Sequence, residues 1–65
     1  MAQNEAMSDA LIKQILTIRA DGKYNMFDAT GIQREAHKRG FYELVVFIEE
    51  HRDRYSRFIL TGQRD

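Results

Sequence analysis

The side chains that could carry acid–base, nucleophilic or metal chemistry are few and scattered in this sequence. The two histidines, His37 and His51, fall on different predicted helices, and neither belongs to an HExxH motif or to a pair of ligands one helical turn apart. Ser8 stands where a helix cap is expected, and Ser56 has no histidine at a spacing that would activate it. The scattered glycines form no phosphate-binding loop. The sequence therefore predicts no catalytic residue, no metal site and no cofactor.

One spacing in the sequence is compatible with a DNA-binding helix-turn-helix motif. Ala36 and Gly40 have the spacing that this motif uses for close helix packing and a tight turn. A recognition helix beginning near Phe41 should offer arginine, asparagine, glutamine or serine to base edges. It offers instead side chains that are apolar or repelled by phosphate, namely Tyr42, Glu43, Val46, Glu49 and Glu50. A DNA-binding regulator, with phosphate contacts from the arginines between 52 and 57, therefore stays an alternative hypothesis.

The sequence predicts apolar side chains that the folded monomer leaves exposed, and these are the candidates for a binding site. The predicted helix that begins at Phe41 carries more apolar side chains than a small monomer can cover, and residues 24–26 have no required structural role. Such surface often marks protein partners, and methionine and tyrosine suit adaptable contacts. We therefore predict a homodimer that shares this helix and that also binds another protein. The candidate partner-binding residues are Tyr24, Asn25, Met26, Tyr42, Val46, Arg54 and Arg57.

Two other interpretations of these residues stay open. Met26 could fill the core while Asn25 makes a local turn bond, which is a common use of asparagine. Alternatively, arginine and tyrosine side chains between two subunits could capture a small anionic ligand.

Length and composition predict one small domain that must rely on packing or self-association. The chain has 65 residues, no cysteine, and ten acidic residues that balance ten basic ones. A chain of this size has a thin margin of stability, and without cysteine it has neither disulfides nor thiolate metal sites. We expect flexible tails at 1–7 and 63–65 around a domain at 8–62. No signal peptide or membrane span is predicted, so the expected location is the cytoplasm.

The first predicted helix runs from Ser8, as the capping residue, to about Ala20. Gly22 follows its end, where a left-handed conformation costs glycine nothing. A second helix is predicted to start after Asp28, with Thr30 as the alternative cap, and to end before Gly40. With Asp28 as the cap, Phe27 and Ile32 occupy the two positions of a hydrophobic staple, a contact that fixes the angle of entry into a helix.

The most apolar segment, residues 41–51, predicts a third helix at the centre of the fold. Phe41, Leu44, Val45 and Ile48 form one stripe, and a helix apolar nearly all round is usually buried from several sides. Asp53 is a candidate cap for a fourth helix, although one continuous helix over 41–60 is equally compatible with the lack of proline and glycine. The predicted fold is all-α, a compact bundle of three or four short helices. Its expected structural residues are Phe27, Asp28, Ile32, Gly40, Leu44, Ile48 and Phe58.

Three segments of the chain carry a resemblance to a known family. ILTIRADGKYNMFD, GFYELVVFIEEH and YSRFILTG resemble a family of very short proteins of tailed phages and prophages, known as a domain of unknown function. The resemblance implies phage or prophage origin and a small accessory role, and it carries over no catalytic residue. We therefore expect a non-enzymatic accessory protein in the host cytoplasm that binds a host or phage macromolecule. Inhibition of a bacterial defence system is one version of that role.

Overall fold

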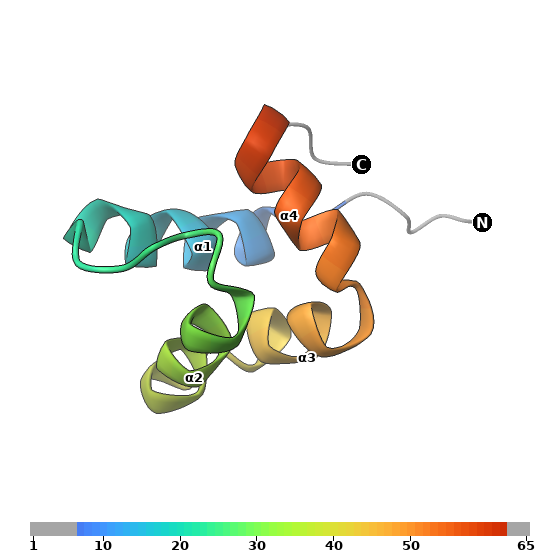
Figure 1. Cartoon of the computed structure of the whole chain (residues 1–65). Helices are drawn as coiled ribbons and strands as arrows, with labels where there is room; N and C mark the ends of the chain where they lie inside the picture. Colours follow the sequence, from blue (N-terminus) through green and yellow to red (C-terminus); the bar gives the residue numbers. More distant parts are fainter. Residues whose placement is uncertain (1–6, 63–65) are drawn as a thin grey trace.

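The computed structural model describes residues 7–62, and this range contains four helices and no strand. The helices are α1 (Asp9–Asp21), α2 (Ala29–Arg39), α3 (Tyr42–Glu50) and α4 (Arg52–Thr61), arranged as Figure 1 shows. The all-α prediction is confirmed in its four-helix form. The predicted tails at 1–6 and 63–65 lie outside the described residues. Met7, by contrast, is 4% exposed, so it belongs to the core rather than to a tail.

Side-chain caps fix the starts of the first two helices. Ser8 Oγ accepts the N–H of Leu11 at 3.0 Å, and Asp28 Oδ1 accepts the N–H of Gly31 at 3.1 Å. The cap of α2 is therefore Asp28 and not Thr30. A Cβ at position 31 would stand 2.5 Å from the Asp28 carboxylate, so glycine at this position leaves room for the cap. The same glycine that lowers helix propensity permits the bond that starts the helix.

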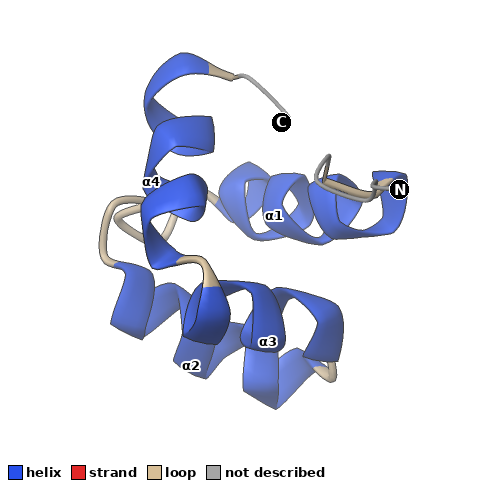
Figure 2. Ribbon diagram, turned by 90° about the vertical axis from the view of Figure 1, so that its right-hand side faces the viewer, coloured by secondary structure: helices blue, strands red, loops and turns tan. Residues whose placement is uncertain are grey.

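Two residues, the left-handed Gly40 and Phe41, join α2 to α3. Gly40 has a φ of 76°, and the N–H groups of Gly40 and Phe41 donate to the carbonyls of His37 and Ala36 at 3.2 and 2.8 Å. These bonds satisfy the last carbonyls of α2. Because the connection is so short, α2 and α3 lie side by side as an αα-hairpin (Figure 2). Gly40 thus has the structural role predicted for it.

The start of α3 is capped by a residue of another helix. The side chain of Phe41 makes no cap bond, and the N–H of Leu44 donates instead to Gln14 Oε1 of α1 at 3.1 Å. Ser8 Oγ, at the start of α1, also donates a hydrogen bond to the carboxylate of Glu43. The beginning of α1 and the beginning of α3 are therefore tied together by polar side chains.

Residues 41–60 form two helices and not one. His51 adopts φ −139° and ψ 53°, outside the helical region, and it is the flanking residue of both α3 and α4. Its N–H donates to Phe47 O at 2.7 Å and its carbonyl accepts from Tyr55 N at 3.0 Å. The prediction that Asp53 caps the last helix is wrong, because α4 begins one residue earlier and Asp53 lies in its first turn. The break turns α4 out of the line of α3 (Figure 1).

The core lies where α2 and α3 meet the other two helices. Both α2 and α3 pack against all three other helices, whereas no Cα atoms of α1 and α4 approach within 8 Å in the described range. The prediction of a central third helix is confirmed, with α2 sharing that position. Four of the expected structural side chains are buried there: Ile32, Leu44, Ile48 and Phe58. The other buried side chains are Met7, Leu11, Ile15, Ile18, Ala29, Ala36, Phe47 and Tyr55.

Candidate binding surfaces

The seven predicted partner-binding residues do not form one surface. Tyr24, Asn25 and Met26 lie on the connector between α1 and α2, Tyr42 and Val46 on α3, and Arg54 and Arg57 on α4. Val46 and Arg54 line one hollow together, whereas the ring of Tyr42 lies against that of His37 on α2. The structure therefore separates a connector group, residues 24–26, from the pair Val46 and Arg54, and it places Tyr42 on the α2 side of α3.

A tight hydrogen-bonded turn forms the end of the connector. Asn25 Oδ1 accepts the N–H of Phe27 at 3.0 Å, and Asn25 O accepts the N–H of Asp28 at 2.9 Å. The carbonyl of Phe27 accepts the N–H of Ala29 at 3.0 Å. The local bond predicted as one role for Asn25 is therefore present. We call residues 25–28, Asn-Met-Phe-Asp, the NMFD turn.

Tyr55 anchors the NMFD turn to α4. Its side chain is fully buried, and its hydroxyl donates to the carbonyl of Met26 at 2.7 Å. Burial, with a smaller contribution from the charge of Asp28, raises the pKa of the Tyr55 hydroxyl well above its ordinary value. The sequence offered one signal for this bond, since a tyrosine inside an apolar stripe needs a partner for its hydroxyl.

Met26 occupies the core position that the sequence left open for it, whereas Phe27 does not have the structural role predicted for it. Met26 is partly buried and packs against the core, whereas Phe27 is 57% exposed and is not among the hydrophobic side chains that pack there. The structural role expected of Phe27 as a staple on Ile32 is therefore wrong, and Ile32 is buried by the core itself.

The exposed Phe27 ring borders a shallow hollow with one cationic side chain. The hollow measures about 320 Å³ and is lined by Arg19 of α1, the connector residues 24–27 and Ile59 of α4. Arg19 makes no ion pair within the described range of 7–62. This surface combines an apolar ring, a partly buried methionine and isoleucine, and a free guanidinium.

Tyr24 belongs to an ionic cluster on the other side of the connector. Arg39, at the end of α2, bonds to the carboxylate of Asp21 and donates from Nε to Glu35 Oε2 at 2.7 Å. The bond from Arg39 lowers the pKa of Glu35, and a hydrogen bond from Tyr24 lowers it further. The cluster links the end of α1 to the end of α2, so Tyr24 has a structural role in addition to its partial exposure.

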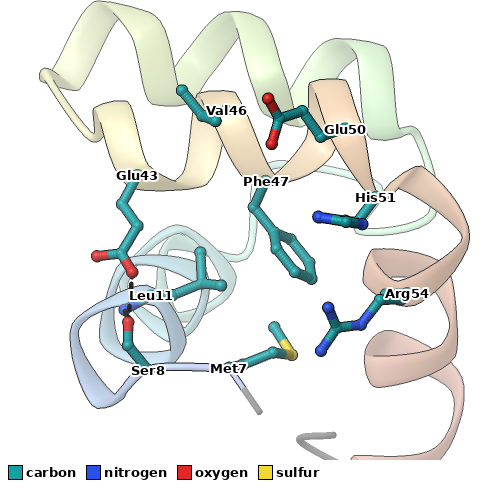
Figure 3. A pocket seen from close by; sticks show the side chains of 9 residues that line it. All are labelled: Met7, Ser8, Leu11, Glu43, Val46, Phe47, Glu50, His51 and Arg54. Carbon is teal, nitrogen blue, oxygen red and sulfur yellow. Dashed lines mark hydrogen bonds between the residues drawn. The ribbon is translucent and has the colours of Figure 1, made fainter. Parts of the chain in front are cut away.

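A second hollow lies between α1, α3 and α4 (Figure 3), and it measures about 480 Å³. Its floor consists of Met7, Leu11 and Phe47, all of which are buried. The guanidinium of Arg54 lies over the Phe47 ring, 5.5 Å from its centroid, which is a cation–π contact. The remaining lining residues are Ser8, Glu43, Val46, Glu50 and His51. Two carboxylates thus border the hollow that holds Arg54, an arrangement that disfavours capture of a small anion.

A third hollow, of about 420 Å³, follows the seam between α2 and α3. Gln33 bridges the two helices, because its Nε2 donates to Val45 O at 2.9 Å and to Glu49 Oε1 at 3.1 Å. Arg34, His37 and Lys38 line the α2 side, with Thr30 and Gln33. Val45 and Glu49 line the α3 side.

The exposed face of α3 has the character expected from the sequence. Tyr42 is 62% exposed and Val46 is 51% exposed, and the exposed acidic residues of the helix are Glu43, Glu49 and Glu50. Such a face suits a protein surface better than a DNA groove, because carboxylates are repelled by phosphate.

Within residues 7–62, no three histidine or acidic side chains lie close enough together to hold a metal ion. None of the four helices is long and apolar enough to cross a membrane.

The chain belongs to a family defined by sequence. The profile of the family described as Domain of unknown function (DUF5049) matches residues 7–63, which includes every helix. No curated protein and no solved structure is significantly similar to the chain. Membership therefore agrees with the resemblance at the level of an uncharacterised domain, and any function has to be argued from the surfaces described above.

Proposed function

We propose that this protein is a small non-enzymatic accessory protein that binds another protein through Phe27. The observation that carries the proposal is a large apolar side chain, 57% exposed, on a backbone turn fixed by hydrogen bonds. The resemblance to short proteins of tailed phages and prophages makes the cytoplasm of a bacterial host the proposed setting. Inhibition of a host defence system is one version of this function.

The rigidity of the NMFD turn supports Phe27 as an anchor. Three hydrogen bonds within residues 25–29 and one from Tyr55 hold the backbone on both sides of the ring. Ordering of a flexible loop on binding costs affinity, and a turn already ordered by folding avoids that cost. An aromatic ring has only two side-chain torsions to fix, which makes it an efficient residue at the centre of an interface.

The surroundings of Phe27 indicate the chemistry of the partner. Arg19 lines the same hollow and makes no ion pair with a carboxylate among residues 7–62. Lys23, two residues before Asn25, is also exposed. We therefore propose a partner with an apolar pocket for the phenyl ring and at least one carboxylate at its edge, where it would pair with Arg19.

Site-specific photo-crosslinking tests this proposal directly. The photoreactive residue p-benzoylphenylalanine replaces Phe27 in one variant and Val46 in a second, and both are irradiated in bacterial cells and in lysate. Val46 is a matched control, because it is also apolar and about half exposed but lies beside the hollow of α1, α3 and α4. We expect an adduct with another protein from position 27 only. Excess wild-type protein and excess Val46→Ala should abolish the adduct, whereas Phe27→Ala should not.

Each other outcome contradicts part of the proposal. An adduct from position 46 alone would assign binding to the α1–α3–α4 hollow. An adduct of twice the mass of the chain would identify a second copy as the occupant of the Phe27 surface. An adduct sensitive to nuclease would favour the DNA-binding hypothesis, and no adduct from either position would contradict protein binding.

A further inference from the structure

The outer face of the α2–α3 hairpin carries opposite charges on its two helices. On α2, Arg34, His37 and Lys38 line the seam, and the acidic residue of that helix, Glu35, is held by Arg39 on the connector side. The sequence of α3, YELVVFIEE, contains three acidic residues and no basic one. Arg34 and Glu49 border the same hollow but form no ion pair with each other within the described range. Of the three acidic residues of α3, only Glu49 lines the seam, because Glu43 and Glu50 border the hollow of α1, α3 and α4. The face thus places the basic side chains of α2 beside a single carboxylate of α3.

The same face also carries apolar surface, beside the Gly40 turn and in the seam. Tyr42 is 62% exposed beside the seam, and Val45 lies partly buried in the hollow. A tyrosine of this kind is typical of the centre of protein interfaces. The Phe27 surface is built from the connector, α1 and α4, so the two surfaces share no lining residue.

We propose that two copies of this chain pack their α2–α3 faces together about a two-fold axis parallel to the two helices. Such an axis places α2 of one copy over α3 of the other, so the basic side chains of each α2 meet the Glu49 carboxylate of the opposite copy. A two-fold axis lying across the helices would instead place α2 over α2 and α3 over α3, with like charges opposed. Electrostatic complementarity therefore favours the first orientation. Each favourable contact occurs twice in the dimer, because a two-fold axis repeats every contact.

Two equivalent pairs of Arg34 with the Glu49 carboxylate of the second copy are the specific contacts of this dimer. The Tyr42 ring, which lies 6.0 Å from the His37 ring of its own chain, would meet the His37 of the second copy across the axis. Helices of 11 and 9 residues offer a face of roughly 16 Å by 20 Å. That is small for a stable interface, so we expect micromolar dissociation.

Charge reversal tests both the face and its orientation. In Arg34→Glu the dimer would contain two Glu–Glu contacts, and in Glu49→Arg it would contain two Arg–Arg contacts. We expect each variant to dimerise at least tenfold more weakly than the wild type in sedimentation equilibrium. An equimolar mixture of the two variants should form a heterodimer, because both contacts become Glu–Arg pairs again. The double variant Arg34→Glu/Glu49→Arg should likewise dimerise with itself.

Controls separate association from folding. Lys13→Glu reverses a charge on an exposed part of α1 and should leave the dimer unchanged. Circular dichroism checks that each variant keeps the helix content of the wild type. If one single variant unfolds, the double variant still tests the pairing, because it should be folded and should dimerise with itself. A wild-type chain that stays monomeric well above micromolar concentration would overturn the proposal. It would also be overturned by a mixture of the two single variants that associates no better than either alone.

Discussion

The two junctions at the ends of the central hairpin are held by different kinds of force. The connector into α2 is fixed by polar groups: Asn25 and Asp28 bond to nearby backbone, and Tyr55 holds the carbonyl of Met26. The junction from α3 to α4 has no side-chain cap at His51, and buried side chains on either side hold its shape. Side-chain hydrogen bonds therefore specify a particular conformation of the connector, whereas the change of helix direction at His51 relies on backbone hydrogen bonds and apolar packing.

Removal of packing near the α3–α4 junction should have the largest effect. Ile48 is fully buried three residues before His51. We expect Ile48→Ala to lower the free energy of unfolding by about 3 kcal/mol, from lost burial and the cavity that remains. A domain this small has little stability to lose, so the variant should be largely unfolded by circular dichroism at 37 °C. Val46→Ala on the exposed side of the same helix is the control, and an equal loss there would contradict the packing argument.

Removal of the Tyr55 hydroxyl should destabilise the connector between α1 and α2 without leaving a large cavity. Tyr55→Phe leaves the carbonyl of Met26 without its donor, and we expect a loss of about 1–2 kcal/mol in urea unfolding. The change should also be local: hydrogen exchange should increase at residues 25–28 more than at His51. An equal increase at both junctions would show that they are not held independently.

The pH dependence of stability should report the same tyrosine. The pKa of Tyr55 is raised in the folded state, so its neutral form is favoured by folding. That contribution is complete below the unfolded-state pKa of about 10 and is lost as pH rises toward the folded-state pKa. We expect a loss on the order of 1 kcal/mol between pH 9 and pH 11, measured by thermal unfolding. The Tyr55→Phe variant should have a flatter profile over that range, and an unchanged profile would contradict the assignment.

Loss of the Asp28 cap is the smallest of these effects. We expect Asp28→Ala to cost about 1 kcal/mol, because the N–H of Gly31 loses its acceptor. Asp28→Asn, which keeps an oxygen at the same position, should retain most of the stability in thermal unfolding. If both variants lose the same amount, the charge of Asp28 near the helix start matters more than its hydrogen bond.

Local features of the fold could be read from the sequence. Ser8, Gly22 and Gly40 are caps that act within a few residues, so neighbouring sequence was sufficient to place them, whereas it left Asp28 and Thr30 as alternative caps of α2. The apolar stripe of α3 likewise predicted its central position.

Features that depend on distant residues could not be read in this way. The bond between Met26 and Tyr55 joins residues that are 29 positions apart, and the exposure of Phe27 has no local sequence signal. The helix break at His51 involves neither proline nor glycine, and the burial of Met7 depends on the core of the folded domain. Of the predicted partner-binding residues, Tyr24, Asn25 and Met26 line the hollow beside Phe27, and Val46 and Arg54 line another. Phe27 itself was expected to have only a structural role.

The cap that Gln14 provides to Leu44 has a consequence for how the chain acquires its structure. Helix α3 completes its first turn with an acceptor from 30 positions earlier, so it lacks a full set of bonds until α1 is already in place. Fragments that begin after α1 should accordingly remain mostly coil, and the intact chain should melt in one cooperative step with no half-folded species populated. A truncation intended to isolate the hairpin would abolish the hairpin itself.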